Sequence, residues 1–377
     1  MTGFKGLVLR VFYYLLFLHY LFWRKFFEKR EAPFKKILVI QDSGIGNLVL
    51  LTPLLENLRR HFPGAEIILL EGQNRASRLI EKGNIVNEIM QYPRTPGEKF
   101  HLARKLRKEK IDLGLTSFLN SNYEMAIFSY LTGARLRAGY HSRKYAYGKG
   151  CGLLYNVRVK LPEITEERHE IERHLDLLRA LRIPVTGRKP EVYITEKDRI
   201  WANNFLQNHG VKEGDKLVGI HPGAGKAMRF KCWPIEKFID LISELGKERA
   251  IKILVVGGKE EEDTAERLKK NVNPEVIFSS GLASLSQSAA LIEKCHLFIS
   301  NDSGPMNIAF ALGVPLVAIF GPTPWQQTAP SGEKCMVIRK SLACMPCYRF
   351  REITCPHRKC LTSISVQEVL EAARKLL

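Results

Sequence analysis

The sequence predicts an α/β protein built from two parallel sheets, and three observations support this. Apolar, strand-like runs alternate with helix-like segments along most of the 377 residues. Leu181–Thr195, with two prolines and a glycine, interrupts this alternation near the middle of the chain. Glycine-bearing turns follow the first strand on either side of that interruption. We therefore expect two halves of comparable size, each a parallel sheet with helices on both faces.

The first half is predicted to cover residues 35–188. Lys35–Gln41 (KKILVIQ) is its first strand, a glycine loop and a helix follow, and AEIILL is the second strand. The remaining expected elements are strands at 87–92, 111–117 and 135–140 and a long helix at Ile164–Leu181.

The second half is predicted to cover residues 189–377. Its expected strands are KLVGIHPGA, IKILVVGG, PEVIFSS, CHLFIS and VPLVAIF, with helices between them. The last helix is expected at Val366–Leu377, where apolar residues recur at helical spacing. Ligands of such sheets bind at the carboxyl ends of the strands, so the cleft between two such halves is the expected site.

The net charge of the chain limits the classes of partner that it is expected to bind. A formal charge of +19 indicates nucleic acid, an anionic membrane surface or substrates that carry phosphate. The sequence contains no zinc-finger helix, RNP-type aromatic motif or dense basic helix, so nucleic acid is not expected as a partner.

The first 34 residues form a separate segment. The apolar run Val11–Trp23 is shorter than the roughly 20 residues that span a bilayer, and no small-residue cleavage site follows it. Eight Lys and Arg residues occur within residues 1–36. Aromatic residues between basic flanks favour a helix that lies in the headgroup layer of the inner membrane on its cytoplasmic side. The alternative is a helix packed on the surface of its own domain.

Three glycine-bearing turns lie at expected strand ends: Asp42–Asn47, His221–Pro234 and Asn301–Pro305. In the third, Asp302 or Ser303 is expected to cap a helix that has Pro305 in its first turn and ends at Gly313. The amino end of a helix at the carboxyl edge of a sheet attracts anions. The first turn is not a GxGxxG motif, so it does not predict a dinucleotide.

Five motifs in order resemble glycosyltransferase family 9, the bacterial lipopolysaccharide heptosyltransferases. They are GIGNLVLLTP, HPGA…KCWP, GGKE, NDSGPM and FGPTPW, and the resemblance extends from about Lys35 to the end of the chain. It implies a GT-B fold, in which two Rossmann-like domains face a central cleft, the first holding the acceptor and the second a nucleotide-sugar donor. It also implies metal-independent transfer of heptose from ADP-heptose, with inversion, onto the inner core of lipid A or a related lipid-linked glycan.

The resemblance assigns roles to single residues. Lys231 matches the cation that stabilises the leaving diphosphate, and Ser303 and Gly304 supply backbone donors to it. Asp302 is expected to order this turn, and Glu260 matches an acidic residue that binds the nucleotide ribose. The other residues expected to approach the ligand are Gly44, Gly46, Gly223, Ala224 and Asn307.

The chain departs from the family pattern at two positions. Asn47 stands where the family has the Asp that acts as general base, and an amide can orient an acceptor but cannot deprotonate it. Asp42, at the same strand end, can take that role, or the base can come from elsewhere, such as an acceptor phosphate. Asn307 stands where a histidine is common, which replaces a titratable donor by an amide.

Four of the eight cysteines cluster in residues 344–360. Cys344, Cys347, Cys355 and Cys360 have the spacing C-x2-C-x7-C-x4-C, which is compatible with a structural zinc site. The alternative is a redox-labile loop.

Three functions remain open at this stage. The leading one is an inverting glycosyltransferase. A GT-B protein that binds a nucleotide sugar or glycolipid without transfer is the second, because Asn47 lacks basicity. A nucleotide-sugar epimerase is the third, but it needs a pair of carboxylates around the sugar, and no convincing pair is evident.

Overall fold

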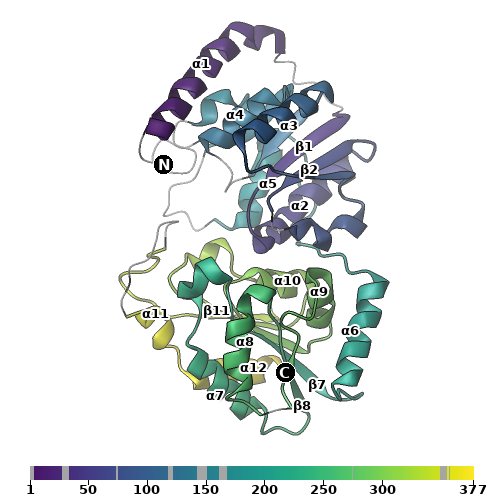
Figure 1. Cartoon of the computed structure of the whole chain (residues 1–377), viewed down its shortest axis with the longest axis vertical. Coiled ribbons are helices and arrows are strands. Elements are labelled where there is room, and N and C mark those ends of the chain that lie inside the picture. Colours follow the sequence, from purple (N-terminus) through teal and green to yellow (C-terminus); the bar gives the residue numbers. More distant parts are fainter. Residues whose placement is uncertain are drawn as a thin grey trace. The chain divides into compact units, whose positions relative to one another are not determined.

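The computed structural model describes residues 4–27, 34–73, 75–117, 122–141, 151–160, 168–273, 275–348, 355 and 357–377. The chain divides into two compact units, Met1–Pro190 and Glu191–Leu377 (Figure 1). Each unit contains one six-stranded sheet, and every strand pair in both sheets is parallel. The α/β fold with two Rossmann-like parallel sheets is therefore confirmed.

The first sheet has the strand order β3-β2-β1-β4-β5-β6. Its strands are β1 Lys36–Gln41, β2 Glu66–Glu71, β3 Glu88–Gln91, β4 Leu113–Thr116, β5 Leu136–His141 and β6 Val157–Lys160. The helices of this unit are α1 Phe4–Phe27, α2 Ile45–His61, α3 Pro96–Lys108, α4 Tyr123–Leu131 and α5 Glu170–Ala180. Its 3-10 turns are η1 Ala76–Leu79, η2 Glu81–Gly83 and η4 Cys151–Leu154.

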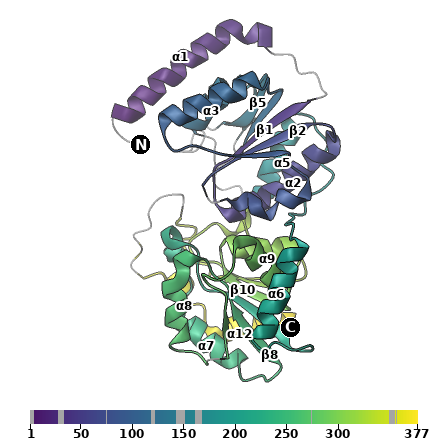
Figure 2. The ribbon, with the colours of Figure 1, turned by 45° about the vertical axis from the view of Figure 1, so that its right-hand side comes forward.

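Helices cover both faces of the first sheet, because its strands are apolar on both sides. Leu38 and Ile40 of β1 share a core with Leu106 of α3 and Phe128 of α4. Helices α2 and α5 contact each other away from that core, and Figure 2 shows them on the side of the sheet opposite α3.

The second sheet has the strand order β12-β11-β10-β7-β8-β9. Its strands are β7 Lys216–His221, β8 Ile251–Val255, β9 Ile277–Phe278, β10 Leu297–Asn301, β11 Leu316–Ile319 and β12 Cys335–Ile338. The helices are α6 Glu196–Asn208, α7 Ile235–Leu245, α8 Glu262–Lys269, α9 Leu285–Glu293, α10 Gly304–Leu312, α11 Lys359–Thr362 and α12 Val366–Leu376. The 3-10 turns are η5 Lys226–Lys231, η6 Lys259–Glu261 and η7 Trp325–Gln327.

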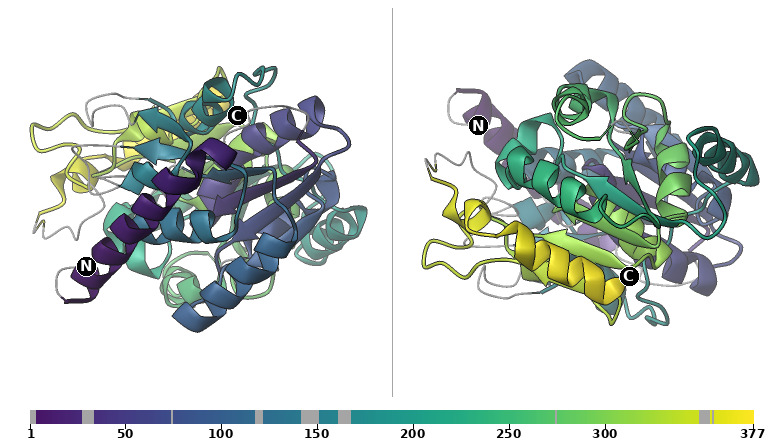
Figure 3. Two further views of the ribbon diagram at one scale, coloured as in Figure 1. Left: turned by 90° about the horizontal axis from the view of Figure 1, so that it is seen from above. Right: turned by 90° about the horizontal axis from the view of Figure 1, so that it is seen from below.

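Two groups of helices cover the second sheet. The main core joins alternate residues of β7, such as Val218 and Ile220, to Phe238 of α7 and Val369 of α12. Figure 3 shows α12 lying across this sheet. On the other face α9 contacts both α6 and α10. A Cβ at Gly219 of β7 would overlap the side chains of Cys295 and of Phe298, which lies on the neighbouring strand β10.

The two sheets have the same topological reversal. In each, the chain lays down three strands toward one edge and then returns to the other side of its first strand. The reversal lies between β1 and β4 in the first sheet and between β7 and β10 in the second. Loops that leave such neighbouring strands diverge to opposite faces and leave room for a ligand at the carboxyl edge.

All the expected strands are present, but two strands were not predicted. They are β6 and β12, the short edge strands of the two sheets. The helix expected from Ile164 begins at Glu170 instead; residues 164–167 lie outside the described residues. The later start of the helix has a local cause. His169 is extended and its ring accepts a hydrogen bond from the Ile171 amide, which caps the helix.

The amino-terminal helix α1 packs on α4 and η4 (Figure 1). Tyr13 contacts Tyr123 edge to face at 4.9 Å between ring centroids, and Tyr20 contacts Tyr130 at 6.3 Å. Both partners advance by one heptad between the two contacts, as expected for two helices that run side by side in the same direction. None of the helices in the described part of the chain is both long and apolar enough to cross a bilayer.

Candidate functional site

The start of α10 lies at the reversal point of the second sheet, directly after β10. Ser303 is the N-cap residue, but its hydroxyl does not cap the helix. It lies 3.0 Å from the Ser300 hydroxyl and 3.0 Å from Nδ1 of His221 instead. The predicted capping role of Ser303 is therefore wrong, because contacts with another strand take the hydroxyl away from the helix. The first turn of the helix is therefore left without a side-chain cap.

Asp302 does not cap the helix either. Its Oδ2 accepts hydrogen bonds from Nζ of Lys231 at 2.8 Å and from Oγ1 of Thr323 at 2.9 Å. The Asp302 side chain is 8% exposed and that of Lys231 is 18% exposed. The ion pair thus fixes the lysine ammonium beside the start of α10.

Asn301 joins three segments around this turn. Its side-chain oxygen accepts a hydrogen bond from the Trp233 amide at 3.0 Å, and its nitrogen donates to the Pro222 carbonyl at 2.7 Å. The residue is completely buried. It therefore holds the loop after β7 and the segment after η5 against the end of β10.

Glu261 supports the same loop through hydrogen bonds to His221 and Gly225. Its Oε2 accepts from Nε2 of His221 at 3.0 Å, and its Oε1 accepts from the Gly225 amide at 3.1 Å. The other ring nitrogen of His221, Nδ1, lies 3.0 Å from the Ser303 hydroxyl. The three side chains form a continuous relay from the buried carboxylate to the start of α10.

The charge of Glu261 is stabilised by this environment. Burial alone would raise the pKa of its carboxyl, but the charge and hydrogen bond of His221 and the backbone amides of Gly225 and Gly258 outweigh burial. The pKa falls to about 2, so the carboxylate stays ionised at neutral pH. A Cβ at Gly223 would overlap this carboxylate, which explains the glycine at that position.

A pocket of about 350 Å³ adjoins the loop after β7. Gly223, Ala224 and Glu260, three residues predicted to approach the ligand, line it together. Glu260 is exposed there, whereas its neighbour Glu261 is largely buried. Four basic side chains also line the pocket: Lys226, Arg229, Arg267 and Arg358.

The second unit therefore presents a set of linked polar side chains around the start of α10, which we call the α10 cluster: His221, Lys231, Glu261, Asp302 and Ser303. A fixed ammonium and the free amides of a helix start can hold a multiply charged oxyanion without reorganisation. Gly304 is the first residue of α10 and contributes its amide there.

Asn307 lies one turn into α10. Its side-chain nitrogen donates to the Ser303 carbonyl at 3.3 Å, and the residue is 5% exposed. Within the described part of the chain its buried side-chain oxygen has no hydrogen-bond partner. The amide thus adds an acceptor near the start of α10, where a histidine would add a titratable group.

The first unit contains a second polar group at its own reversal point, the Asp42 cluster: Asp42, Tyr92, Lys99 and Glu124. Tyr92 donates to Oε1 of Glu124 at 2.9 Å, and Nζ of Lys99 binds the same oxygen. The Asp42 side chain reaches solvent. Partial burial raises the pKa of its carboxyl, the charge of Glu124 raises it further, and Lys99 opposes both.

The residues around Asp42 allow a close approach of backbone. Gly44 is the N-cap of α2 and has no side chain to cap it, and Gly46 and Asn47 lie in the first helical turn. A Cβ at Gly72 would overlap Oδ1 of Asp42, so the glycine after β2 makes room for this carboxylate. Asp42 and Asn47 therefore belong to one edge of the first unit, and Lys231 belongs to the second unit.

The four cysteines of the predicted metal site all lie in the described residues, although residues 349–354 and 356 between them do not. Cys344 and Cys347 are exposed, Cys360 is buried, and Cys355 Sγ lies 3.6 Å from Nδ1 of His357. Burial and the charges of the neighbouring thiols raise the pKa of both Cys347 and Cys360. Among the described residues, no three His, Cys, Asp or Glu side chains are arranged to hold a metal ion.

Four supporting residues were not predicted from the sequence: His221, Glu261, Asn301 and Thr323. Three of them lie inside the recognised motifs HPGA, NDSGPM and FGPTPW, so the motifs indicated their positions but not their partners. Glu261 differs from Glu260 by one position at the end of a loop, and only the fold distinguishes the buried carboxylate from the exposed one.

Comparisons with known proteins agree with this architecture. The chain is 26% identical to lipooligosaccharide heptosyltransferase 2 of Campylobacter jejuni over 353 residues, which cover 91% of this chain and 98% of that protein. It is 26% identical to lipopolysaccharide heptosyltransferase 2 of Escherichia coli K12, over 81% of this chain and 88% of that protein.

Solved structures show the same fold. The glycosyltransferase of family 9 from Veillonella parvula has a TM-score of 0.77 at 22% identity, covering 92% of this chain and 98% of its own. The ADP-heptose lipopolysaccharide heptosyltransferase II of E. coli has a TM-score of 0.72 at 24% identity, covering 90% and 98%. The family model "Glycosyltransferase family 9 (heptosyltransferase)" matches residues 99–358, which is more than half of the chain. The chain belongs to glycosyltransferase family 9, the heptosyltransferases.

Proposed function

We propose that this protein transfers heptose from ADP-heptose, with inversion, onto the inner core of a lipopolysaccharide or a related lipid-linked glycan. The observation that carries the proposal is the α10 cluster, a fixed ammonium beside an uncapped helix start in a member of a heptosyltransferase family. A relative of known structure, the E. coli heptosyltransferase WaaC, was solved with ADP and with ADP-2-deoxy-2-fluoro heptose. These complexes support a nucleotide-sugar donor for this chain.

The proposed reaction is a single displacement at the anomeric carbon. An acceptor hydroxyl oxygen attacks this carbon from the face opposite the diphosphate, and a new C–O bond forms as the bond to the diphosphate oxygen breaks. The electron pair of the broken bond stays on the diphosphate, which leaves as ADP. Lys231 and the amides at the start of α10 lower the energy of this growing charge.

The acceptor proton requires a base, and we assign Asp42 to it. Its carboxyl has a raised pKa, so as a carboxylate it is a stronger base than an ordinary aspartate. Asn47, one helical turn into α2, is assigned to orient the acceptor by hydrogen bonds. In this proposal the first unit binds the acceptor and the second binds the donor through Glu260, Lys231 and the start of α10.

We further assign the protein to the cytoplasmic face of the inner membrane, as a peripheral protein. The acceptor is anchored in that membrane, and the exposed apolar side chains of α1, such as Leu18 and Phe22, support contact with it.

The cysteine segment is proposed as a structural zinc site without a part in transfer. Burial and the neighbouring thiols raise the pKa of Cys347 and Cys360, so thiolates in this segment would repel one another, and a bound Zn²⁺ would remove that repulsion. Elemental analysis of the purified protein tests this: about one zinc per chain is expected in the wild type. A wild-type protein without zinc, or a Cys344→Ser, Cys347→Ser variant that retains it, contradicts the assignment.

The second candidate function is donor or glycolipid binding without transfer, which the amide at Asn47 favours. One experiment separates the two. Product formation from ADP-heptose on a defined lipid A–Kdo acceptor is measured beside calorimetric binding of ADP-heptose. Transfer supports the proposal, binding without transfer over several acceptors supports the second candidate, and failure to bind ADP-heptose overturns the donor assignment.

A further inference from the structure

Helix α1 leaves a broad apolar surface uncovered within the described part of the chain. Tyr13 and Tyr20 are buried against the rest of the first unit. On the other side, Val11, Leu15, Leu18 and Phe22 follow a spacing of four, three and four residues, which places them on one stripe of a helix. The α1 apolar face consists of these four and the exposed residues Phe12, Tyr14 and Leu21.

The exposure of this face is large. Phe22 is 74% exposed, Leu18 62% and Leu15 59%. Scattered apolar side chains on a protein surface are normal, but a contiguous set of large ones marks a binding surface. A helix of this kind, with basic residues at its ends, suits the boundary between lipid headgroups and acyl chains.

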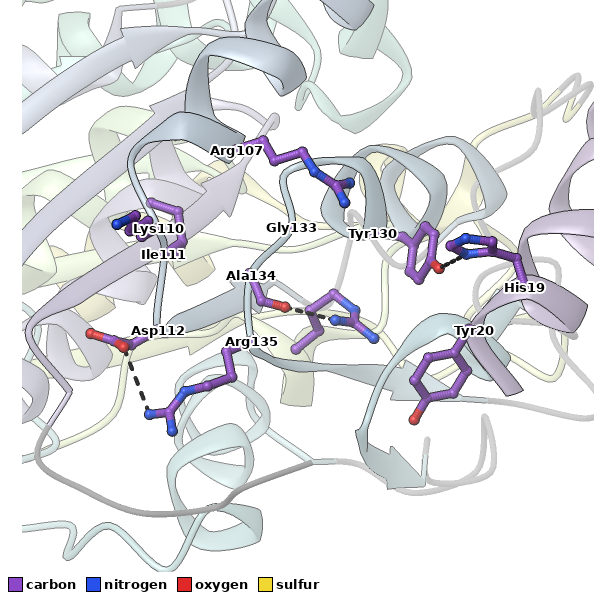
Figure 4. A pocket seen from close by; sticks show the side chains of 11 residues that line it. His19, Tyr20, Arg107, Lys110, Ile111, Asp112, Tyr130, Gly133, Ala134 and Arg135 are labelled. Carbon is purple, nitrogen blue, oxygen red and sulfur yellow. Dashed lines mark hydrogen bonds and ion pairs between the residues drawn. The ribbon is translucent and has the colours of Figure 1, made fainter. Parts of the chain in front are cut away.

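A basic pocket of about 630 Å³, which we call the α1 pocket, borders the same helix at His19 and Tyr20 (Figure 4). The pocket lies at the amino edge of the first sheet, between the end of α3, the turn before β4 and the turn before β5. Four basic side chains line it, Arg107, Lys110, Arg135 and Arg137, with Asp112 as the carboxylate among the lining residues.

The carboxylate in the pocket is already engaged. Oδ2 of Asp112 accepts hydrogen bonds from the amides of Lys35 and Lys36 at 2.8 and 3.0 Å, which ties it to the start of β1. Oδ1 of Asp112 lies 3.7 Å from Arg135. Arg107 and Lys110 form no ion pair with any residue that the structure describes. The positive charge of the pocket is therefore only partly compensated.

Arg137 is a rigid part of this pocket. It is 4% exposed, and its guanidinium donates to the carbonyls of Leu154 at 2.9 Å and Ala134 at 2.6 Å. The same group lies 5.3 Å from the ring centre of Tyr20 and 5.2 Å from that of Tyr130. His19 Nδ1 lies 2.6 Å from the Tyr130 hydroxyl, which connects α1 to this wall of the pocket.

We propose that the α1 pocket binds the phosphate headgroup of an anionic phospholipid while the α1 apolar face lies among the acyl chains. Guanidinium and ammonium groups are the usual partners of phosphate. His19 lines the pocket and lies four residues after Leu15 and three before Phe22, so the pocket borders the apolar face at this residue. This inference builds on the proposed membrane contact but is independent of sugar transfer.

The test uses the full-length protein and sedimentation with phosphatidylcholine vesicles that contain or lack phosphatidylglycerol. Arg107→Gln with Lys110→Gln removes two charges from the pocket and keeps the aliphatic part of Arg107 that packs on Gly133. We expect its partition onto phosphatidylglycerol vesicles to fall roughly 30-fold, since each basic residue near an anionic surface contributes about 1 kcal/mol. Leu18→Ser with Phe22→Ser should reduce binding to both kinds of vesicle.

The matched control removes two exposed charges elsewhere, through Lys82→Gln and Arg249→Gln. It should retain wild-type binding, whereas equal losses in control and pocket variants would show that overall charge suffices and would overturn the pocket. Wild-type binding that does not depend on phosphatidylglycerol would do the same. A dimer that is broken by the α1 apolar-face variant without loss of vesicle binding would mean that a second copy covers this face.

Two further readouts keep the results distinct. Thermal unfolding of each variant should match the wild type, since a purely structural pocket would lose stability instead of lipid binding. Transfer onto a water-soluble acceptor should be unchanged in the pocket variant. If the wild type transfers sugar but does not bind vesicles, this inference fails and the proposed transferase activity stands.

Discussion

The carboxyl edges of the two sheets have the same topology but differ in the charged groups that they present. In the second unit the edge is built from linked side chains: Lys231 is bonded to Asp302, Ser303 to His221, and His221 to Glu261. In the first unit Asp42 reaches solvent and its pKa is raised. The same strand order therefore supports one edge with fixed donors and another with a basic carboxylate.

The difference follows from what each edge has to do in the proposed reaction. Stabilisation of a diphosphate requires charges that are held in place before the reaction begins. Removal of a proton requires a group whose charge state can change near the working pH. The following experiments are arranged to disturb one edge at a time.

The largest effect is expected at the edge of the first sheet, which carries Asp42. Asp42→Asn preserves the size of the side chain but removes its basicity, so kcat should fall about 10³-fold while the Kd for ADP-heptose is unchanged. The acid limb of the wild-type pH–rate profile should lie above the range of an ordinary aspartate, because the Asp42 pKa is raised. That limb should disappear in the variant.

Asn47→Ala is the matched control for Asp42. Loss of an orienting amide should raise KM for the acceptor several-fold and change kcat by less than about tenfold. If Asp42→Asn retains wild-type kcat, the acceptor proton goes to another base and the contrast between the two edges loses its chemical basis.

At the bonded edge, Lys231→Ala should lower kcat/KM for the donor by about 10²-fold, since one charged partner of the leaving group is lost. Asp302→Asn retains an acceptor for the Thr323 hydroxyl and should cost less. Urea unfolding of both variants separates lost transition-state binding from lost stability. A Lys231→Ala enzyme with normal kcat/KM would contradict the role of this ammonium.

Glu261 should contribute to the stability of the second unit in a pH-dependent way. Its folded pKa of about 2 lies below the unfolded value of 4.5, so its contribution is present above pH 4.5 and is lost as the pH falls through 4.5 toward 2. Glu261→Gln should cost about 2 kcal/mol of unfolding free energy at pH 7 and much less near pH 2.

Tryptophan fluorescence suits this measurement, because Trp201, Trp233 and Trp325 all lie in the second unit. Glu260→Gln is the neighbouring control, and its exposed side chain should leave the unfolding free energy unchanged. A cost for Glu261→Gln that is the same at all pH values would mean that the carboxylate charge is not what holds the loop.

The smallest expected effect on stability comes from Glu170, a buried carboxyl in the first unit whose pKa shift is opposite in sign to that of Glu261. Burial raises the pKa of Glu170 to about 7, only partly opposed by Arg173, and lowers that of His174, 3.5 Å away, to about 3. Because the folded Glu170 holds its proton more tightly than the unfolded chain does, its contribution is lost as the pH rises from about 4.5 to 7.

Glu170→Gln should therefore stabilise the protein by about 1 kcal/mol at pH 8 and have little effect at pH 5, measured by urea unfolding with circular dichroism. Glu172→Gln, on an exposed ion pair with Arg179, is the control and should show no such rise with pH. Destabilisation by Glu170→Gln at pH 8 would show that the ionised carboxylate is favourable in the folded state.

The sequence predicted the strand and helix order well because buried parallel strands are continuous apolar runs. It did not predict β6, whose residues VRVK alternate between apolar and basic, or β12, whose four residues are all only partly buried. The capping prediction at Ser303 failed for another reason. A local pattern such as Asp-Ser before a helix specifies only local bonds, and His221, 82 residues away, competes for the same hydroxyl.

The turns that form both edges were predicted as well, since glycines at strand ends and the family motifs mark them. The hydrogen-bond partners within these turns were not predicted. The choice of Glu261 over Glu260 as the buried support, and the pairing of Asn301 with two other segments, depend on contacts between distant parts of the chain. The α1 apolar face was visible as a pattern, but its basic pocket draws on α1, α3, α4 and β5 together.

The two tyrosine contacts between α1 and α4 have a consequence for how the protein would search for its acceptor. Tyr123 adjoins Glu124 of the Asp42 cluster, and Tyr130 lines the α1 pocket seven residues later, about 10 Å along the helix axis. Docking at both points keeps α1 aligned with the helix that carries these two sites. A protein held on a bilayer through α1 would therefore keep its first unit at a constant tilt to the bilayer while it diffuses in two dimensions, and would meet its acceptors by lateral encounter instead of by repeated capture from solution.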